Sequence, residues 1–391
     1  MSKTVQDILS MIADNGIQMV DFKMVDINGA YRHVSIPAKN FSEETMKNGI
    51  GFDASNYGYA VVEKSDMVFI PDPDTAVIDP FCQIPTLSMT GNAMIIDYPE
   101  NRPLAQYPRN IVRAAEQYMK DTGVADTMLI LPEFEFYLFD NAGWEVAAHH
   151  VGATVDAEQA HWNSYDQGQG VIVPKQKNYH IAKPFDTSYE ARSEMCLLME
   201  EMGIKINYHH PEVSASGQYE IEPQLDKMSK LADDTMLIKY IIRNVALKYG
   251  KSATFMPKPV YGEAGSGMHV HMLLLKDGQP VFSDDEGYAH LSKEAHWFMG
   301  GLLKHIHSLC ALTNPSTNSF KRLVPGFEAP VTVGYATSNR SAVIRIPAYA
   351  KKPELRRFEL RNPDATCNPY FCYAAILMAG LDGIKNQIDP A

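Results

Sequence analysis

Strand-like runs that carry acidic or histidine side chains at alternate positions constrain this chain more than any other feature. Residues two apart in an extended strand point to the same face of a sheet. Glu133 and Glu135 in LILPEFEFYLF therefore share one face, and so do His269 and His271 in GSGMHVHMLL. Two carboxylates on one face repel each other and lose hydration energy unless a cation neutralises them. The fold must therefore supply a counter-charge, and a divalent metal ion is the first to consider.

Three more carboxylates extend this set. Glu212 and Glu220 flank the turn-like sequence SASGQ, and Glu359 lies in the strand-like run RRFELR. Glu222 continues the alternation after Glu220, so one of these two side chains could face solvent or have a structural role. Oxygen ligands of this kind suit Mg²⁺ or Mn²⁺ rather than Zn²⁺. Together with the histidines, the carboxylates predict a divalent-metal site and therefore an enzyme.

Each motif alone also has an ordinary structural interpretation. Glu133 and Glu135 could lie on an exposed strand face above buried phenylalanines, because surface carboxylates are common. A single strand histidine such as His269 is more often structural than a metal ligand, although the glycines of the preceding GSG would allow a ligand to approach the backbone. Only the combination of motifs favours metal binding.

A cluster of arginines is the second constellation. Its members are Arg322, Arg340, Arg345, Arg357 and Arg361. The guanidinium fork matches carboxylate and phosphate groups, although a surface ladder of ion pairs would use the same residues. Metal-binding acids together with clustered arginines are expected in phosphoryl transfer, where positioning and charge neutralisation do most of the work. The chain has no Walker A, GxGxxG or GxSxG pattern, so no phosphate-loop or serine-nucleophile motif is visible.

The composition limits the classes of protein to consider. The 391 residues are 45% hydrophobic and 21% charged, as in a globular protein of two or three domains. The net charge of −12 argues against nucleic acid as a partner, whose binding proteins are usually basic. The five cysteines include no CxxC pair, which fits a reducing cytoplasm. Without a signal-peptide pattern or an apolar run of about 18 residues, we expect a cytoplasmic protein and no membrane segment.

The N-terminal part predicts a small mixed domain over residues 1–100. An amphipathic helix is expected over residues 4–15, and two strands joined at Asn28-Gly29 form a hairpin. The Pro- and Asn-rich residues 98–108 indicate a linker. Further short strands are expected over residues 60–69, 75–78 and 93–98.

The large domain, residues 101–391, is expected to alternate helices with strands. Thr187 and Glu190 form a capping-box pattern at the start of a helix that ends at Gly203. Asn368-Pro369 is a good start for a final helix. The polar residues 147–179 predict a long loop. Two more helices and a hairpin are expected over residues 230–250 and 294–313 and at Asp277-Gly278.

Several long runs resemble type I glutamine synthetases: LPEFEFYLFD, RSEMCLLMEEMG, ATFMPKP, GSGMHVHM, NSFKRLVPGFEAPV, SNRSAVIRIP, RRFELRNPD and NPYFCYAAILMAGLDGIK. The resemblance covers the chain from about residue 15 onward. It implies an α+β fold with an N-terminal β-grasp-like domain and a C-terminal catalytic domain, whose curved antiparallel sheet is flanked by helices. It also implies ATP-dependent ligation of ammonia to the γ-carboxylate of L-glutamate through γ-glutamyl phosphate, giving glutamine.

The resemblance implies ATP and two or three Mg²⁺ or Mn²⁺ ions as cofactors. His271, Arg345 and Arg357 would contact ATP, and Arg340 would stabilise the transferring phosphoryl group. One ion would be bound by Glu135, Glu212 and Glu220, and the other by Glu133, His269 and Glu359.

The resemblance also implies roles in substrate binding. Glu328, in the loop VPGFEAP, would close over the intermediate, contact the substrate with Arg340 and help to take a proton from ammonium. Asp53, in GFDASN, would bind and deprotonate ammonium at the site of a neighbouring subunit. L-glutamate would be held by Arg322, Arg361 and the backbone of Ala264 and Gly265.

Four places depart from the family pattern. Asn56 stands where serine is usual, Ala264 where asparagine is usual, KNYH at residues 177–180 where GGYF is usual, and Glu354 where lysine is common. These departures bear on the choice of amine. The resemblance further implies a homo-oligomeric ring, a hexamer or a dodecamer, with active sites at subunit interfaces. In typical members a helical tail that ties two rings together follows the position of Ala391, and this chain is expected to lack that tail, which leaves the number of rings open.

Several functions stay open at this point. The first is glutamate–ammonia ligase, favoured by the presence of both Asp53 and Glu328. A near alternative is a γ-glutamyl ligase for another amine, such as methylamine or a polyamine. A weakly active or regulatory paralogue would be expected to lack metal ligands or arginines, and none is missing. A metal hydrolase would need neither the arginines nor the FEAP loop.

Overall fold

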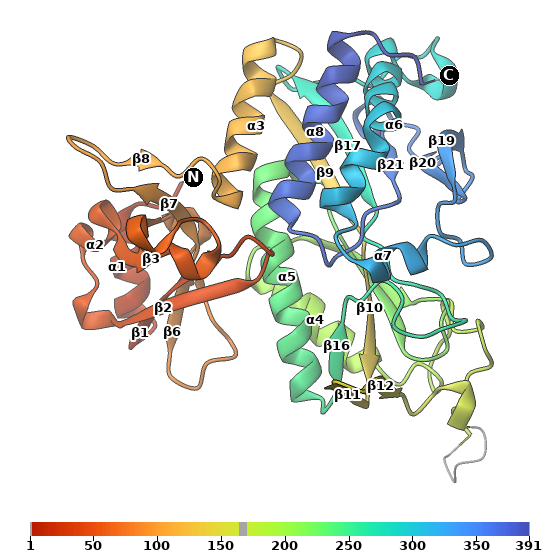
Figure 1. Ribbon diagram of the computed structural model, residues 1–391, viewed down its shortest axis with the longest axis horizontal. Helices are drawn as coiled ribbons and strands as arrows, with labels where there is room; N and C mark the ends of the chain where they lie inside the picture. The colour runs from red at the N-terminus through yellow and green to blue at the C-terminus, as the bar shows by residue number, and fades with distance from the viewer. Residues whose placement is uncertain (1, 164–169, 391) are drawn as a thin grey trace. The chain divides into compact units, whose positions relative to one another are not determined.

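The computed structural model describes residues 2–163 and 170–390. The chain divides into two compact units, Met1–Ala115 and Glu116–Ala391 (Figure 1). Each unit combines helices with mainly antiparallel sheets, which confirms the predicted α+β class. The predicted domain boundary at residue 100 stays a prediction, because helix α3 (Pro108–Thr122) runs across the division between the units.

The N-terminal unit contains two four-stranded sheets, with strand orders β2-β1-β6-β5 and β3-β4-β7-β8. Its helices are α1 (Val5–Asp14) and α2 (Glu43–Asn48). Its strands are β1 (Met19–Val25), β2 (Tyr31–Pro37), β3 (Ile50–Asp53), β4 (Asp66–Pro71), β5 (Val77–Ile78), β6 (Thr86–Met89), β7 (Gly91–Ile95) and β8 (Arg102–Pro103). The antiparallel pairing of β1 with β2 confirms the predicted hairpin, and Gly29 supplies the positive φ of 77° that its turn requires.

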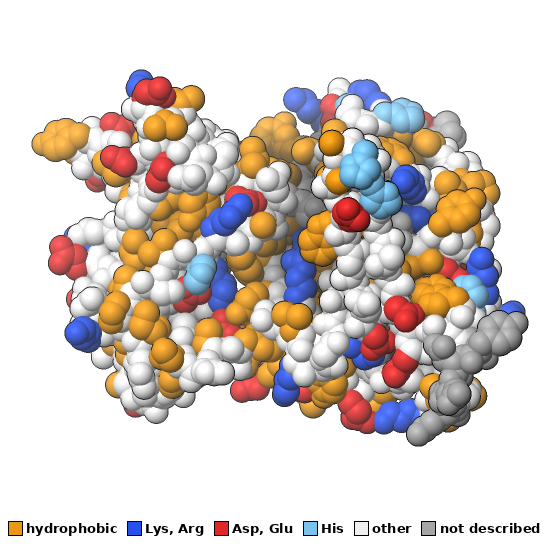
Figure 2. All heavy atoms as spheres, turned by 60° about the horizontal axis from the view of Figure 1, so that its bottom comes forward, with side chains coloured by type: hydrophobic (Ala, Val, Ile, Leu, Met, Phe, Trp, Pro, Cys, Tyr) orange, Lys and Arg blue, Asp and Glu red, His pale blue; other side chains and the backbone are white. Residues whose placement is uncertain are grey.

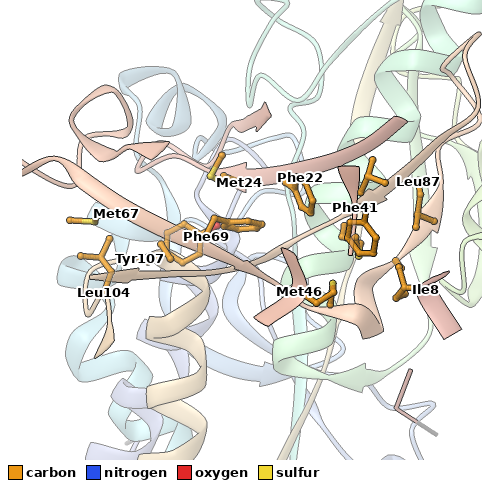
Figure 3. Packing of buried hydrophobic residues seen from close by; sticks show 14 of the residues in the cluster. Ile8, Phe22, Met24, Phe41, Met46, Met67, Phe69, Leu87, Leu104 and Tyr107 are labelled. Carbon is orange, nitrogen blue, oxygen red and sulfur yellow. The ribbon is translucent and has the colours of Figure 1, made fainter. Parts of the chain in front are cut away.

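An aromatic cluster fills the core of this unit (Figure 3). The ring of Phe22 lies 6.5 Å from that of Phe41 and 6.4 Å from that of Phe69. Ile8 from α1 is fully buried in the same cluster. The predicted helix over residues 4–15 is confirmed, with Thr4 as its N-cap. The strand predicted from residue 60 begins only at Asp66, because the preceding residues form a 3₁₀ turn.

The C-terminal unit contains a seven-stranded sheet, a four-stranded sheet and a hairpin. The seven-stranded sheet has the order β15-β9-β17-β21-β20-β19, and β18 pairs with β17. Its strands are β9 (Thr127–Pro132), β15 (Asp226–Lys227), β17 (Val270–Lys276), β18 (Gln279–Pro280), β19 (Thr332–Thr337), β20 (Ala342–Ile346) and β21 (Phe358–Leu360). All of these pairs are antiparallel except β19 with β20.

The four-stranded sheet has the order β13-β14-β10-β16. Its strands are β10 (Phe134–Phe139), β13 (Ile206–Pro211), β14 (Gln218–Pro223) and β16 (Ser252–Thr254). The hairpin consists of β11 (Asn141–Ala147) and β12 (His150–Asp156). The long loop predicted over residues 147–179 is therefore wrong in its first part, where β12 pairs with β11. Residues 164–169 of that prediction lie outside the described residues.

Five further helices belong to this unit: α4 (Tyr189–Glu201), α5 (Met228–Lys248), α6 (Lys293–Thr313), α7 (Thr317–Arg322) and α8 (Pro369–Lys385). Helices α6 and α8 lie side by side (Figure 1). Glycine permits their close approach, because a Cβ at Gly301 would lie 2.1 Å from the carbonyl oxygen of Ala379. Asn368 caps α8 as predicted, by accepting a hydrogen bond from the Tyr370 amide.

The capping box predicted at Thr187 is wrong, although the helix itself is present. Ser188 is the N-cap of α4 and makes no side-chain cap bond. The Thr187 hydroxyl instead donates to Oε1 of Gln159 at 2.9 Å, and Glu190 pairs with Lys183. A tertiary contact therefore replaces the local one.

The surface and the helices add two observations. On the face drawn in Figure 2, Lys and Arg side chains are interspersed with Asp and Glu side chains. Within residues 2–163 and 170–390, none of the helices combines the length and the apolar character needed to span a lipid bilayer.

Candidate active site

Two rows of side chains form the centre of the C-terminal unit, one in each of its larger sheets. In the four-stranded sheet, His210 on β13 pairs with Glu220 on β14, and Glu220 pairs with Glu135 on β10. Directly opposed residues on antiparallel strands project from the same face, with their β-carbons about 5 Å apart. One imidazole and two carboxylates, from strands that are distant in the sequence, therefore meet in a single row.

The second row lies in the seven-stranded sheet, where Glu359 on β21 pairs with Arg345 on β20 and with His271 on β17. Glu133 lies between β9 and β10, where the chain leaves one sheet and enters the other. An oxygen of its carboxylate lies 2.7 Å from Nδ1 of His269, and the other oxygen lies 2.8 Å from Nε2 of His271. Glu133 thus contacts both histidines of the predicted pair, and the exposed strand face considered above is wrong because Glu133 is buried.

Glu133, His269 and Glu359 form the first group that could hold a metal ion. Each offers one ligand atom, these atoms lie within 4.8 Å of one another, and all three residues are buried. Burial opposes ionisation of Glu133, yet hydrogen bonds with His269 and His271 hold its pKa well below the usual range. Burial and the nearby Arg361 guanidinium lower the pKa of His269, which favours the neutral imidazole that a metal requires. The structure brings together the three residues that the sequence suggested for one ion.

His210, Glu212 and Glu220 form a second such group. Nε2 of His210 lies 3.5 Å from Glu220, and its Nδ1 lies 3.8 Å from Glu212. The family resemblance implied Glu135 in this set and not His210, although HHPE carries the histidine two residues before Glu212. Glu135 is next to Glu220 in the row, but its Oε2 accepts a hydrogen bond from the Gly267 amide at 2.8 Å. The assignment of Glu135 as a ligand stays a prediction.

Glu222 forms a third group with Glu133 and Glu220, and all three are buried. Neither Glu220 nor Glu222 therefore faces solvent. The Glu222 carboxylate accepts hydrogen bonds from Nδ2 of Asn207, at 2.7 Å, and from the Tyr208 hydroxyl.

The acidic groups of the site repel one another. Burial and the neighbouring carboxylates raise the pKa of Glu212 and of Glu220 well above the usual value. A divalent ion would remove this repulsion, and carboxylate oxygens with one imidazole in a group suit Mg²⁺ or Mn²⁺. The residues present therefore fit the cofactor that the sequence predicted.

The five predicted arginines lie around these groups. Arg345 pairs with the Glu359 carboxylate, and Nε of Arg357 donates to Nδ1 of His271 at 3.3 Å. Arg322 is buried and donates to the carbonyl oxygens of Asn362, at 2.9 Å, and of Arg361, at 2.8 Å. Its Nη2 also donates to Nε2 of His269 at 3.1 Å.

Arg361 connects three parts of the site. It pairs with Glu359, and it donates to the carbonyl oxygens of Arg340 and Glu328, both at 3.1 Å. Glu328 has a positive φ of 57°, which is uncommon outside glycine and often marks a functional segment. Its carboxylate is exposed and lies 3.9 Å from Nε of Arg340. We call residues 324–330, which contain Glu328, the flap.

Many of these side chains line one cavity of about 500 Å³. It is lined by Glu133, Glu135, Tyr179, Glu212, Val213, Glu220, Ala264, Gly265, His269, Arg322, Phe327, Glu328, Ala329, Arg340 and Arg361. His271 and Glu359 are not part of the lining but contact it, through Glu133 and Arg361 respectively. Arg357 and Arg345 lie one step further out, on His271 and on Glu359. The backbone of Ala264 and Gly265 is fixed, because the Ala264 carbonyl oxygen accepts from the Tyr137 hydroxyl and the Gly265 carbonyl oxygen accepts from Nε2 of Gln218.

Sequence reasoning missed four lining residues. Tyr179 lies in the KNYH run and Phe327 in the flap, so both motifs were noted without these side chains being selected. Val213 and Ala329 carry no chemical signal that a sequence could offer. Asp53 belongs to the N-terminal unit, where its exposed carboxylate accepts from the Ser55 amide at 2.9 Å. Hydrogen bonds from the Ser55 hydroxyl and amide lower the pKa of Asp53.

The fold, the candidate metal-ligand groups and the arginines around one cavity fit the class of enzymes that transfer phosphoryl groups with the help of divalent metal ions. Two family models match the chain: "Glutamine synthetase, beta-Grasp domain" over residues 16–95, and "Glutamine synthetase, catalytic domain" over residues 105–391. The chain belongs to the glutamine synthetase family, as the sequence motifs suggested. The match identifies the N-terminal fold as a β-grasp and supports an ATP-dependent ligase that uses divalent metals.

Curated relatives support the same family but not a single activity. Glutamine synthetase of Pasteurella multocida is 45% identical over 391 residues, with 99% of this chain and 82% of that protein covered. A protein named 3-hydroxylaminophenol mutase from Cupriavidus pinatubonensis is also 45% identical, with 100% of this chain and 83% of that protein covered. Family membership therefore leaves the substrate open.

Solved structures agree on the fold. Plasmodium falciparum glutamine synthetase has a TM-score of 0.89 at 29% identity, covering 100% of this chain and 77% of that chain. Apo GmaS has a TM-score of 0.80 at 26% identity, covering 99% of this chain and 83% of that chain.

Proposed function

We propose that this protein is a glutamate–ammonia ligase, which joins ammonia to the γ-carboxylate of L-glutamate while ATP is converted to ADP and phosphate. The observation that carries this proposal is the convergence of metal-ligand groups, Arg340, Arg361 and the Glu328 flap on one cavity. A metal hydrolase would need the acids but not the arginines or the flap. The presence of every ligand and arginine also argues against an inactive paralogue.

In this proposal the acidic groups hold the ions. Glu133, His269 and Glu359 would bind one ion, and Glu212 and Glu220, together with Glu135 or His210, would bind another. Divalent ions at these positions would neutralise the ATP phosphates and the glutamate carboxylate. His271 and Arg345 would support the first set, because His271 contacts Glu133 and Arg345 contacts Glu359.

The arginines would position the reactants of the first step. An oxygen of the glutamate γ-carboxylate forms a bond to the terminal phosphorus of ATP, and the bond to ADP breaks. Arg340 lines the cavity and has an exposed side chain. It would stabilise the charge on the transferring phosphoryl group. Arg322 and Arg361 are buried and line the cavity, and Arg322 lies beside Gly265, where the amino acid would bind.

The second step needs a base, because ammonium has no lone pair. A proton would pass from ammonium to Glu328 or to Asp53, the nitrogen would bond to the acyl carbon, and phosphate would leave. From the family resemblance we infer that Asp53 acts in the site of a neighbouring copy within a homo-oligomeric ring. The flap would exclude water and protect the acyl phosphate from hydrolysis.

Another amine is the second candidate, and one feature of the site favours it. His180 stacks on Tyr179 with ring centroids 3.9 Å apart. The His180 and His210 rings meet in a T-shaped arrangement with their centroids 4.4 Å apart. Tyr179 lines the cavity, so these aromatic rings could face an organic amine such as methylamine or a polyamine.

The test is a phosphate-release assay with ATP, L-glutamate and each of ammonium, methylamine and putrescine, in Mg²⁺ and in Mn²⁺. We expect ammonium to be the fastest amine and to yield one glutamine for each phosphate. Faster release with an organic amine would overturn the choice of ammonia. Turnover without ATP, including conversion of 3-hydroxylaminophenol, would overturn the ligase itself.

A further inference from the structure

Lys258 is a buried cation directly beneath the flap. Its ammonium lies 3.6 Å from the centre of the Phe327 ring, and only 9% of the residue is exposed. The same ammonium donates a hydrogen bond to the carbonyl oxygen of Glu263. We call residues 263–265, of which Ala264 and Gly265 line the cavity, the wall. Lys258 therefore contacts both the flap and the wall, yet it does not line the cavity.

The backbone around Lys258 is fixed to the rest of the site. The Lys258 amide donates to Oδ1 of Asn318 at 2.7 Å, and Nδ2 of Asn318 donates to the Lys258 carbonyl oxygen at 3.1 Å. Asn318 lies on α7, the helix that carries Arg322. The Pro257 carbonyl oxygen accepts from the Ser266 amide at 2.8 Å. The ammonium of Lys258 thus extends from a segment that is clamped on two sides.

The environment makes this contact stronger than a surface contact. Burial lowers the pKa of Lys258, while the Glu263 carboxylate acts in the opposite direction. The attraction between a cation and an aromatic face increases when water is removed from the cation. Phe327 is half-buried and precedes Glu328, whose carbonyl oxygen is held by Arg361. Two consecutive flap residues are therefore each held by a different cation.

We propose that Lys258 is a positioning residue for amide formation: its ammonium holds the Phe327 ring, and with it the flap, against the 263–265 wall while the acyl phosphate is present. This inference rests on the proposed function. Lys258 does not line the cavity, so it would act through the flap. Its loss should therefore let water reach the acyl phosphate, so that phosphate is released without amide formation.

The test compares Lys258→Met, Lys258→Arg and Phe327→Leu in the full chain. The readout is the ratio of phosphate released to amide formed, together with glutamate-dependent phosphate release when no amine is present. We expect Lys258→Met to raise the ratio by about tenfold while KM for ATP changes by less than about twofold, and we expect Lys258→Arg to restore most of the coupling. The double variant Lys258→Met/Phe327→Leu should be no worse than the more affected single variant.

Lys183→Met is the matched control, because the Lys183 ammonium lies 4.8 Å from the Tyr189 ring but on an exposed side chain. It should leave the ratio unchanged. An unaltered ratio in Lys258→Met, equal defects in the Met and Arg variants, or additive defects in the double variant would each overturn the proposal. If Lys258→Met does not fold, Phe327→Leu alone must raise the ratio for the proposal to stand.

The wild-type protein separates this inference from the proposed function. If the wild type uses an amine other than ammonium, the proposed choice of amine fails and the same ratio is measured with that amine. If the wild type forms amide and the Lys258 variants remain fully coupled, only the present inference fails.

Discussion

Arg361 donates a hydrogen bond from Nη2 to the backbone carbonyl oxygen of Glu328 at 3.1 Å. The same guanidinium pairs with the Glu359 carboxylate and donates from Nε to the Arg340 carbonyl oxygen. One side chain therefore connects the flap, the exposed arginine and a candidate metal ligand. A planar group with several donors in fixed directions can make these contacts at once, whereas an ammonium group cannot reproduce their geometry.

Replacing Arg361 by lysine should therefore damage the reaction although the charge is kept. We expect Arg361→Lys to lower kcat/KM for L-glutamate by about 100-fold or more, which corresponds to about 2.7 kcal/mol. Steady-state kinetics with ATP at saturation measures this effect. Arg356→Lys is the control, because Arg356 contacts Ser283 and Asp285 instead. Equal activity of the two variants would contradict the connecting role of Arg361.

Removal of one buried carboxylate should raise the melting temperature of the metal-free protein but reduce the stabilisation that Mn²⁺ provides. Glu220 is surrounded by carboxylates that raise its pKa along with burial, so Glu220→Gln should melt at a higher temperature than wild type in EDTA. With Mn²⁺ present, the wild type should gain several degrees and the variant much less, because a ligand is lost. Activity should fall by about 100-fold. Melting curves with and without Mn²⁺ provide the measurement, and equal Mn²⁺ stabilisation of both proteins would argue against Glu220 as a ligand.

Gly265 should tolerate no side chain. A Cβ there would lie 2.3 Å from the Pro257 carbonyl oxygen and 2.8 Å from Cγ of Arg322. The Pro257 carbonyl group cannot shift without losing its hydrogen bond from the Ser266 amide. Gly265→Ala should raise KM for L-glutamate by about tenfold or more, or destabilise the protein by about 2 kcal/mol. Gly334→Ala on β19 is the control, because its Cβ would meet no atom within 4 Å. Wild-type kinetics and stability for Gly265→Ala would show that the wall is not rigid.

Lys239 provides a test of pH dependence away from the site. It is buried on α5, and burial lowers its pKa from 10.5 to about 8, although Cys367 and Asp364 oppose the shift. Between about pH 8 and 10.5 the unfolded state binds more protons than the folded state, so this group makes stability rise with pH across that window. Below pH 8 the buried charge costs roughly 3 kcal/mol.

Lys239→Met should therefore be more stable than wild type at pH 7 by up to roughly 3 kcal/mol, and the difference should shrink as pH approaches 10.5. Urea denaturation at several pH values measures it. Lys248→Met, which removes an exposed lysine from the same helix, should show little change at any pH. A pH-independent difference between Lys239→Met and wild type would contradict the depressed pKa.

Local patterns predicted much of the fold. The hairpin at Asn28-Gly29 and the start of α8 at Asn368 follow from turn and capping chemistry within a few residues. The capping box at Thr187 failed because its hydroxyl found a more distant partner, Gln159. The paired strand after Ala147 was also missed: Val151, Ala153 and Val155 alternate along it, but the surrounding Gly, His and other polar residues are typical of a loop.

By itself, the sequence determined which chemical groups were available and which of them share a strand face, as with Glu220 and Glu222 on β14, because side-chain alternation is a local property of extended backbone. Tertiary structure alone decided which groups meet. The row of His210, Glu220 and Glu135 exists only because β13, β14 and β10 pair in one register, and Lys258 reaches Phe327 only after both segments are folded. Such contacts join residues far apart in the chain, and strand register and packing, which local propensity does not encode, bring them together.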